Sequence, residues 1–61
     1  MVNLEQIKKG DKVRVTDGSI WLVHSGPDDD KWFILQEINE WGDPTDYYEE
    51  EAYHQIIEVL N

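Results

Sequence analysis

The chain has 61 residues with fourteen acidic and five basic side chains, a formal net charge of -9 and no cysteine. A chain of this length forms one domain at most, and it buries only about 60% of the surface that it exposes when unfolded. Without cysteine it has no disulfide framework and no thiolate zinc site. We therefore expect a single small domain over residues 1–61, with a thin core of aliphatic and aromatic side chains.

The sequence also gives an expectation for the cellular compartment of the protein. No apolar run approaches the roughly 20 residues that a membrane span needs, and the first five residues lack the basic and apolar regions of a signal peptide. Three Trp, three Tyr and one Phe argue against a disordered chain despite the charge. We expect a folded cytoplasmic protein without a membrane partner.

The charges are unevenly distributed along the chain. Four of the five basic residues precede residue 15, and residues 37–61 contain no Lys or Arg. The excess of carboxylates disfavours direct capture of a phosphate backbone, so direct nucleic-acid binding is not the first expectation, and it favours a cationic partner. The other interpretation is an acidic surface that only keeps the protein soluble, and it stays open.

A single helical turn followed by a β-strand is predicted at the N-terminus. Asn3 is a suitable cap for a turn over residues 4–7, whose two apolar side chains are spaced to pack on one end of the core. The run 12–16 then alternates between polar and apolar residues. This alternation predicts a half-buried strand with Val13 and Val15 on its inner face.

Asp17-Gly18 joins this strand to a second apolar run at residues 19–23. Two β-branched runs joined by Asp-Gly are the strongest short-range signal for a β-hairpin. In the second run Trp21 and Val23 share one face, while the other face is also apolar. Such a pattern is expected where a strand bends between two small sheets.

The middle of the chain predicts a third strand between two turns. Residues 25–30 are rich in Ser, Gly, Pro and Asp, which favour turns. Residues 31–38 begin as a continuous apolar run, so we expect a central strand with both faces at least partly covered, in which Trp32 packs in or around the core. Residues 39–44 break the pattern again, and Trp41 beside a glycine is expected to be the most exposed tryptophan.

The last segment supports two interpretations. Asp43 and Pro44 resemble a helix start, and apolar residues follow with the spacing of one helix face. Against a helix, residues 49–51 are three glutamates without a basic partner at i+4, and Ile57 and Val59 alternate as in a strand. Local pattern favours the helix slightly.

The order of these signals resembles a bacterial or phage SH3-like small β-barrel of the KOW and Tudor general type. The residues that carry the resemblance are the lead-in Leu4 to Val13, the Asp17-Gly18 turn, the Trp21-x-Val23 strand, the strand with Phe33 and Leu35, and the closing run Ile56-Ile57-Glu58-Val59.

The resemblance implies a mainly β fold: a five-stranded barrel with a fourth strand at residues 45–50, a 3₁₀ turn at residues 52–55 and a closing strand. The alternative is an α+β fold, a three-stranded antiparallel sheet with a C-terminal helix over residues 44–60. The chain lacks the Ala-Leu-Tyr-Asp-Tyr run and the paired tryptophans of peptide-binding SH3 domains, and it lacks a basic loop. Neither polyproline binding nor nucleic-acid binding is therefore inherited from the resemblance.

Few residues suggest catalysis or metal binding. Asp28, Asp29 and Asp30 lack the spacing of a calcium loop, and His24 and His54 lack a zinc-binding spacing. No Ser or Thr has a recognisable triad companion, and so small a chain rarely encloses a ligand-sized pocket. We expect no enzyme activity, no metal site and no cofactor.

Aromatic side chains set among carboxylates are the first candidate for function. Trp and Tyr anchor protein interfaces through large amphipathic surfaces. We expect a non-catalytic interaction module that binds a basic protein, with a small phage-type inhibitor that mimics nucleic acid as one form. The candidate acidic aromatic face consists of Trp41, Asp43, Asp46, Tyr47, Tyr48, Glu49 and Glu50.

Two alternatives stay open. A nucleic-acid-binding barrel would use basic side chains with an aromatic that stacks on bases. Its residues would be Lys8, Lys9, Lys12, Arg14, Lys31 and Trp32. A homo-oligomer would instead pair its strand edges between subunits and so hide the surplus aromatic side chains.

Overall fold

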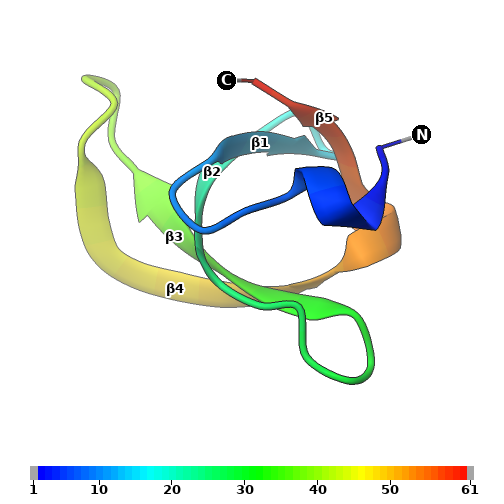
Figure 1. Cartoon of the computed structure of the whole chain (residues 1–61). Helices are drawn as coiled ribbons and strands as arrows, with labels where there is room; N and C mark the ends of the chain where they lie inside the picture. The colour runs from blue at the N-terminus through cyan, green and yellow to red at the C-terminus, as the bar shows by residue number, and fades with distance from the viewer. Residues whose placement is uncertain (1, 61) are drawn as a thin grey trace.

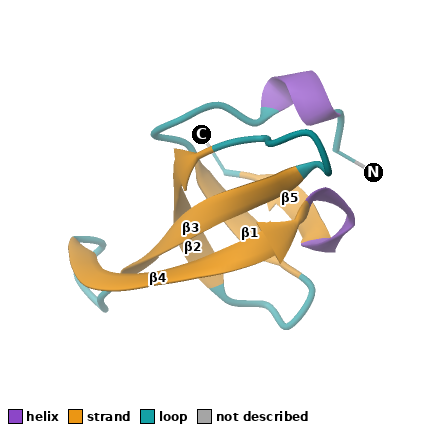
Figure 2. Cartoon of the chain, turned by 90° about the horizontal axis from the view of Figure 1, so that it is seen from below, coloured by secondary structure: helices purple, strands orange, loops and turns teal. Residues whose placement is uncertain are grey.

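The computed structural model describes residues 2–60, which form five strands and two 3₁₀ turns. The strands make one antiparallel sheet of order β4-β3-β2-β1-β5 (Figure 1). The elements are η1 (Leu4–Gln6), β1 (Lys12–Val15), β2 (Ile20–Ser25), β3 (Trp32–Ile38), β4 (Pro44–Ala52), η2 (Tyr53–Gln55) and β5 (Ile56–Val59). Figure 2 shows β4 along one edge of this sheet, beside β3. The expectation of a mainly β fold with five strands is confirmed.

One face of the curled sheet forms the core, and we call it the inner face. Alternate residues of the central strands point to it, and Val13, Val23, Phe33 and Leu35 are at most 1% exposed. The remaining buried hydrophobic residues are Val2, Ile7, Val15, Ala52 and Ile56. The alternation read from residues 12–16 is thus confirmed, because Val13 and Val15 are both buried.

The N-terminal turn covers part of this core. The backbone N–H of Gln6 donates to the carbonyl of Asn3 at 3.0 Å, which closes one turn of 3₁₀ helix. This turn places Ile7 in the core and packs Leu4 against it. The predicted turn and the packing role of its two apolar residues are confirmed.

The Asp-Gly hairpin is present between β1 and β2. Gly18 has φ +90°, and its N–H donates to the carbonyl of Val15 at 2.8 Å. The Asp17 carboxylate accepts bonds from the N–H and the hydroxyl of Ser19. These bonds, the side-chain bond first, hold the pKa of Asp17 below its ordinary value.

The strand β3 differs from expectation on one face. It lies between β2 and β4, with Phe33 and Leu35 buried on the inner face. On the other face, which we call the outer face, Trp32 and Ile34 are 42% and 39% exposed. The outer face is thus only partly covered, which agrees with the prediction of at least partial cover, but the prediction that Trp32 packs in or around the core is wrong, because no element within residues 2–60 packs over this side chain.

The structure of residues 44–60 distinguishes between the helix and the strand interpretations of this segment. A helix over this range is wrong: residues 44–52 form β4, residues 53–55 form η2, and residues 56–59 form β5. β4 pairs with β3, and β5 pairs with β1. These long-range pairings satisfy the backbone hydrogen bonds and bury Ile56. The predicted 3₁₀ turn before the last strand is confirmed.

Candidate protein-binding surface

The seven residues of the acidic aromatic face do not gather on one face. Trp41 and Asp43 lie in the β3–β4 turn, where Trp41 is 77% exposed, as expected. The other five lie in β4, whose successive side chains point to opposite faces of the sheet. Tyr47 and Tyr48 are adjacent in sequence and therefore belong to different surfaces.

Tyr47 belongs to the inner face, at an open end of it. Its ring centroid lies 6.2 Å from that of Trp21, and its hydroxyl donates to Glu49 Oε1 at 2.6 Å. Trp21 is half-buried, and its Nε1 donates to the hydroxyl of Ser19 at 2.8 Å. Tyr47 itself is 51% exposed. This pair of rings is thus partly available to solvent and is bordered by a carboxylate.

The bond between Tyr47 and Glu49 predicts a shifted titration. The hydrogen bond to Glu49, followed by the charge of that carboxylate, raises the pKa of Tyr47 above its ordinary value of about 10. A raised folded-state pKa means that the bond stabilises the fold below about pH 10 and that this contribution is lost as pH rises through the shifted value. In an NMR titration of the Tyr47 ring, we expect Glu49→Gln to move the midpoint down towards the ordinary value. Glu50→Gln, on the other face of β4, is the control and should leave the midpoint in place; equal shifts in both variants would contradict this geometry.

Tyr48 belongs to the outer face. Its ring meets the His24 ring edge-on, with centroids 4.9 Å apart, and its hydroxyl accepts a bond from Gln36 Nε2 at 3.2 Å. Gln36 also donates to the carbonyl of Thr45 at 2.7 Å. Tyr48 remains 44% exposed. Side chains of β2 and β3 therefore contact its ring while leaving much of it accessible.

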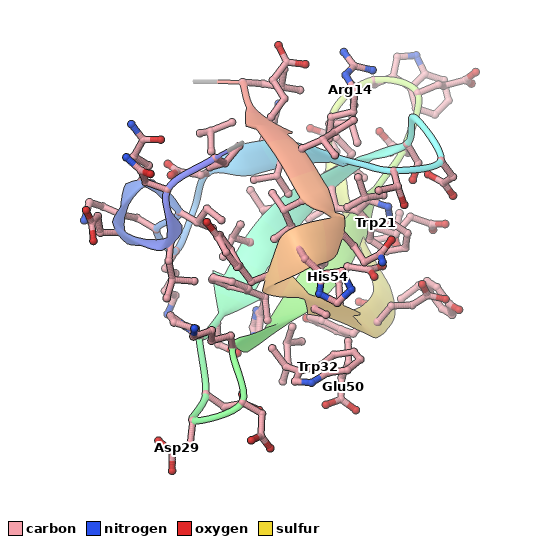
Figure 3. The ribbon with its side chains drawn as sticks, turned by 90° about the vertical axis from the view of Figure 1, so that its right-hand side faces the viewer. Arg14, Trp21, Asp29, Trp32, Glu50 and His54 are labelled. Carbon is pink, nitrogen blue, oxygen red and sulfur yellow. The ribbon has the colours of Figure 1, made fainter. Side chains whose placement is uncertain are left out.

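Tyr48 is one of three exposed hydrophobic side chains on this outer face, together with Trp32 and Ile34. In the register of β3 and β4, Ile34 lies opposite Glu50, and Gln36 lies opposite Tyr48. Ile34 is therefore the diagonal neighbour of Tyr48, and Trp32 is the diagonal neighbour of Glu50. Figure 3 shows Trp32 and Glu50 side by side. We call this set the outer patch: Trp32, Ile34, Tyr48 and Glu50.

Sequence reasoning did not identify the outer patch. It placed Trp32 in the nucleic-acid alternative, left Ile34 out and assigned Tyr48 to the same surface as Tyr47. The signal was nevertheless available in the period of two along residues 32–36. Once Phe33 and Leu35 occupy the core, Trp32 and Ile34 must point to the opposite face.

The basic residues of the alternative face are dispersed. Arg14 Nε pairs with Glu58 Oε1 at 3.0 Å, and Arg14 Nη1 donates to the carbonyl of Gly18 at 3.1 Å. Figure 3 shows Arg14 and Trp32 at opposite ends of the molecule. Lys31 follows three aspartates in the β2–β3 loop, Lys8 and Lys9 precede β1, and Lys12 Nζ lies beside Gly42. These six residues do not form one basic face.

In the β2–β3 loop, the Asp28 carboxylate stabilises the loop backbone through hydrogen bonds. Asp28 Oδ1 accepts bonds from the N–H groups of Asp30 and Trp32, both at 2.9 Å. Asp29 stands at the tip of this loop, away from the sheet (Figure 3). The two histidines are apart, since His24 lies in β2 and His54 in η2. Within residues 2–60, no three His, Asp or Glu side chains are grouped to hold a metal ion.

A shallow depression lies between the β1–β2 and β3–β4 turns. Its volume is about 520 Å³, and Trp21 and Ile38 supply its apolar walls. Ser19 and Glu37 line it as well, but both are engaged: Ser19 with Asp17 and Trp21, and Glu37 with the Thr45 hydroxyl at 3.0 Å.

Comparisons with known proteins found no match, whether to a protein-family model, to a curated protein or to a solved structure. Within the described part of the chain, neither 3₁₀ turn approaches the length and apolar character of a membrane-spanning helix.

Proposed function

We propose that this chain is a non-catalytic protein-interaction module that binds a basic, partly apolar partner through the outer patch. The observation that carries the proposal is the group of three exposed hydrophobic side chains, 39% to 44% exposed, next to Glu50 on two adjacent strands. Contiguous exposed apolar surface with a polar rim marks interaction sites more often than scattered single residues do.

The charge of the chain supports a basic partner. The formal net charge is -9, and the edge strand β4 carries Asp46, Glu49, Glu50 and Glu51 without a basic residue. Such a surface steers cationic partners towards it and repels acidic ones. Aromatic anchors that contribute binding energy, combined with carboxylates that select the partner, match the composition of the outer patch.

Mimicry of nucleic acid is one specific form of this proposal. Residues 49–51 are three consecutive glutamates on the extended edge strand, with Glu49 and Glu51 on the inner face and Glu50 on the outer face. A basic groove that binds phosphates is thus a suitable partner surface, as it is for a small phage-type inhibitor.

The nucleic-acid alternative has weaker support. The Arg14 guanidinium is paired with Glu58, and Lys31 follows three aspartates in the β2–β3 loop. Affinity for a phosphate backbone needs several cations that act together.

We also propose that the sheet belongs to the SH3-like small barrel class. The strand order β4-β3-β2-β1-β5 and the 3₁₀ turn η2 directly before β5 support this assignment. An experimental structure in which β1 and β5 do not pair, or in which η2 is absent, would contradict it.

The proposed function predicts the result of an affinity experiment with matched variants. The intact protein and a Tyr48→Ser/Glu50→Lys variant are immobilised, and proteins retained from a bacterial lysate are identified by mass spectrometry. We expect the intact protein to retain a basic partner and the variant to bind it at least about tenfold more weakly, because truncated anchors and reversed charges remove binding energy directly.

The control variant is Ile57→Ser/Asp29→Lys. Ile57 is 48% exposed on β5, at the other edge of the sheet, and Asp29 is exposed at a loop tip, so the control removes one hydrophobic side chain and reverses one charge elsewhere. Circular dichroism verifies the fold of each protein. If the control loses the partner as completely as the outer-patch variant, net charge and not the outer patch governs binding, and the proposed site is wrong.

A further inference from the structure

β4 leaves one long edge of the sheet open. Among residues 2–60, β4 pairs with β3 on one side and has no strand on the other. It has nine residues, whereas β5 at the opposite edge has four. Alternate residues of an edge strand direct their N–H and C=O groups away from the sheet, where another strand can bond to them. This edge is thus a ready template for strand pairing.

The two tyrosines of β4 show from which direction a partner approaches. Tyr47 is 51% exposed on the inner face, and Tyr48 is 44% exposed on the outer face. A partner that covers only the outer patch leaves Tyr47 in solvent. A strand along the edge places its side chains on both faces in turn, so it contacts both tyrosines at once.

We propose that the partner adds a β-strand to the free edge of β4, and that this strand is an extended segment rich in Lys and Arg. The inference rests on the proposed function and names the form of the partner. Main-chain hydrogen bonds to β4 supply affinity in this mode of recognition, and the side chains on either face supply specificity.

Charge complementarity selects a basic segment over a second copy of this chain. Two β4 strands side by side bring four carboxylates on each strand close together, in chains that each carry a net charge of -9. Like charges on neighbouring strands are destabilising, and opposite charges are favourable. A Lys- or Arg-bearing segment meets Glu50 on the outer face, and Glu49 and Glu51 on the inner face.

A bulge limits the length of the added strand. Residues 48–52 of β4 pair regularly with residues 36–32 of β3, but between Gln36 and Ile38 the register shifts, and residues 45–47 all lie opposite Glu37. A bulge bends the strand and increases its twist. We therefore assign the added strand to the regularly paired residues 48–52 together with Tyr47, the last residue of the bulge, a stretch that a peptide of six to eight residues spans.

The test uses a capped parent octapeptide of alternating Lys and Val, and two N-methylated forms of it that are isomers of each other and have the same charge as the parent. One isomer is N-methylated at every Lys amide and the other at every Val amide. Because an added strand bonds to β4 through alternate amides only, we expect the parent peptide to bind and one of the isomers to bind at least about tenfold more weakly than the other. Hydrogen exchange by NMR should show protection at alternate amides of residues 47–51.

Each other outcome overturns strand addition. Equal binding of the parent and both isomers means that side chains alone make the contact; the outer patch then stands, but the added strand does not. If the parent peptide does not bind, but the Tyr48→Ser/Glu50→Lys variant still loses the lysate partner, the outer patch again stands and the added strand does not. Protection of the same amides that grows with protein concentration, without peptide, identifies a second copy as the occupant.

Discussion

Phe33→Ala is expected to unfold most of the protein at room temperature. Phe33 is 1% exposed and belongs to the largest fully buried side chains of the core. Truncation of a buried Phe to Ala removes about 3–5 kcal/mol from the free energy of unfolding, since it leaves a cavity as well as losing buried area. A domain of this size has only about 3–9 kcal/mol in total.

Urea denaturation followed by circular dichroism measures this loss. Ile34→Ala is the matched control, because Ile34 is the next residue of β3 but lies on the outer face and is 39% exposed. Its truncation should cost less than about 1 kcal/mol. A similar loss of stability in both variants would mean that β3 does not divide its residues between a core face and a solvent face as described.

Gly26→Ala is expected to have the second largest effect. Gly26 has φ +118°, a conformation that side-chain-bearing residues rarely adopt. A Cβ atom on it would lie 2.9 Å from the Trp32 carbonyl oxygen and 3.0 Å from Phe33 Cα. Because both contacts are with the backbone of β3, neither can be relieved by rotating a side chain. We expect the free energy of unfolding to fall by at least about 2 kcal/mol.

Gly18→Ala separates backbone strain from the steric clash in this experiment. Gly18 has φ +90°, but a Cβ atom added there meets nothing within 4 Å. We expect this control to cost about 1 kcal/mol from the unfavourable φ alone. Should the two alanine variants unfold at the same urea concentration, the close approach of residue 26 to β3 would be refuted.

Local sequence alone determined several elements, independently of the tertiary packing. The period of two places Val13 and Val15 on one face, and the positive φ of Gly18 explains why Asp17-Gly18 forms the first hairpin. Trp41 is exposed because it lies in a turn with Gly42, where φ is +85°. In each case the decisive interactions lie within a few residues, so they can be read from adjacent positions.

Long-range pairing decided the C-terminal segment. In isolation residues 44–60 favour helical spacing slightly, but β4 gains its hydrogen bonds from β3 and β5 gains its own from β1, more than 40 residues earlier. The Arg14 to Glu58 pair lies on this same β1–β5 contact. Helix propensity is a weak preference that such tertiary contacts override.

The candidate site shows the same division between local pattern and tertiary structure. Composition identified aromatic residues among carboxylates, and it indicated that their surface is acidic. Only the folded sheet separated Tyr47 from Tyr48, placed Ile34 beside Tyr48 and Trp32 beside Glu50, and engaged Arg14 with Glu58. A strand assigns successive side chains to opposite faces, so the residues that share a surface are set by strand register and not by proximity along the chain.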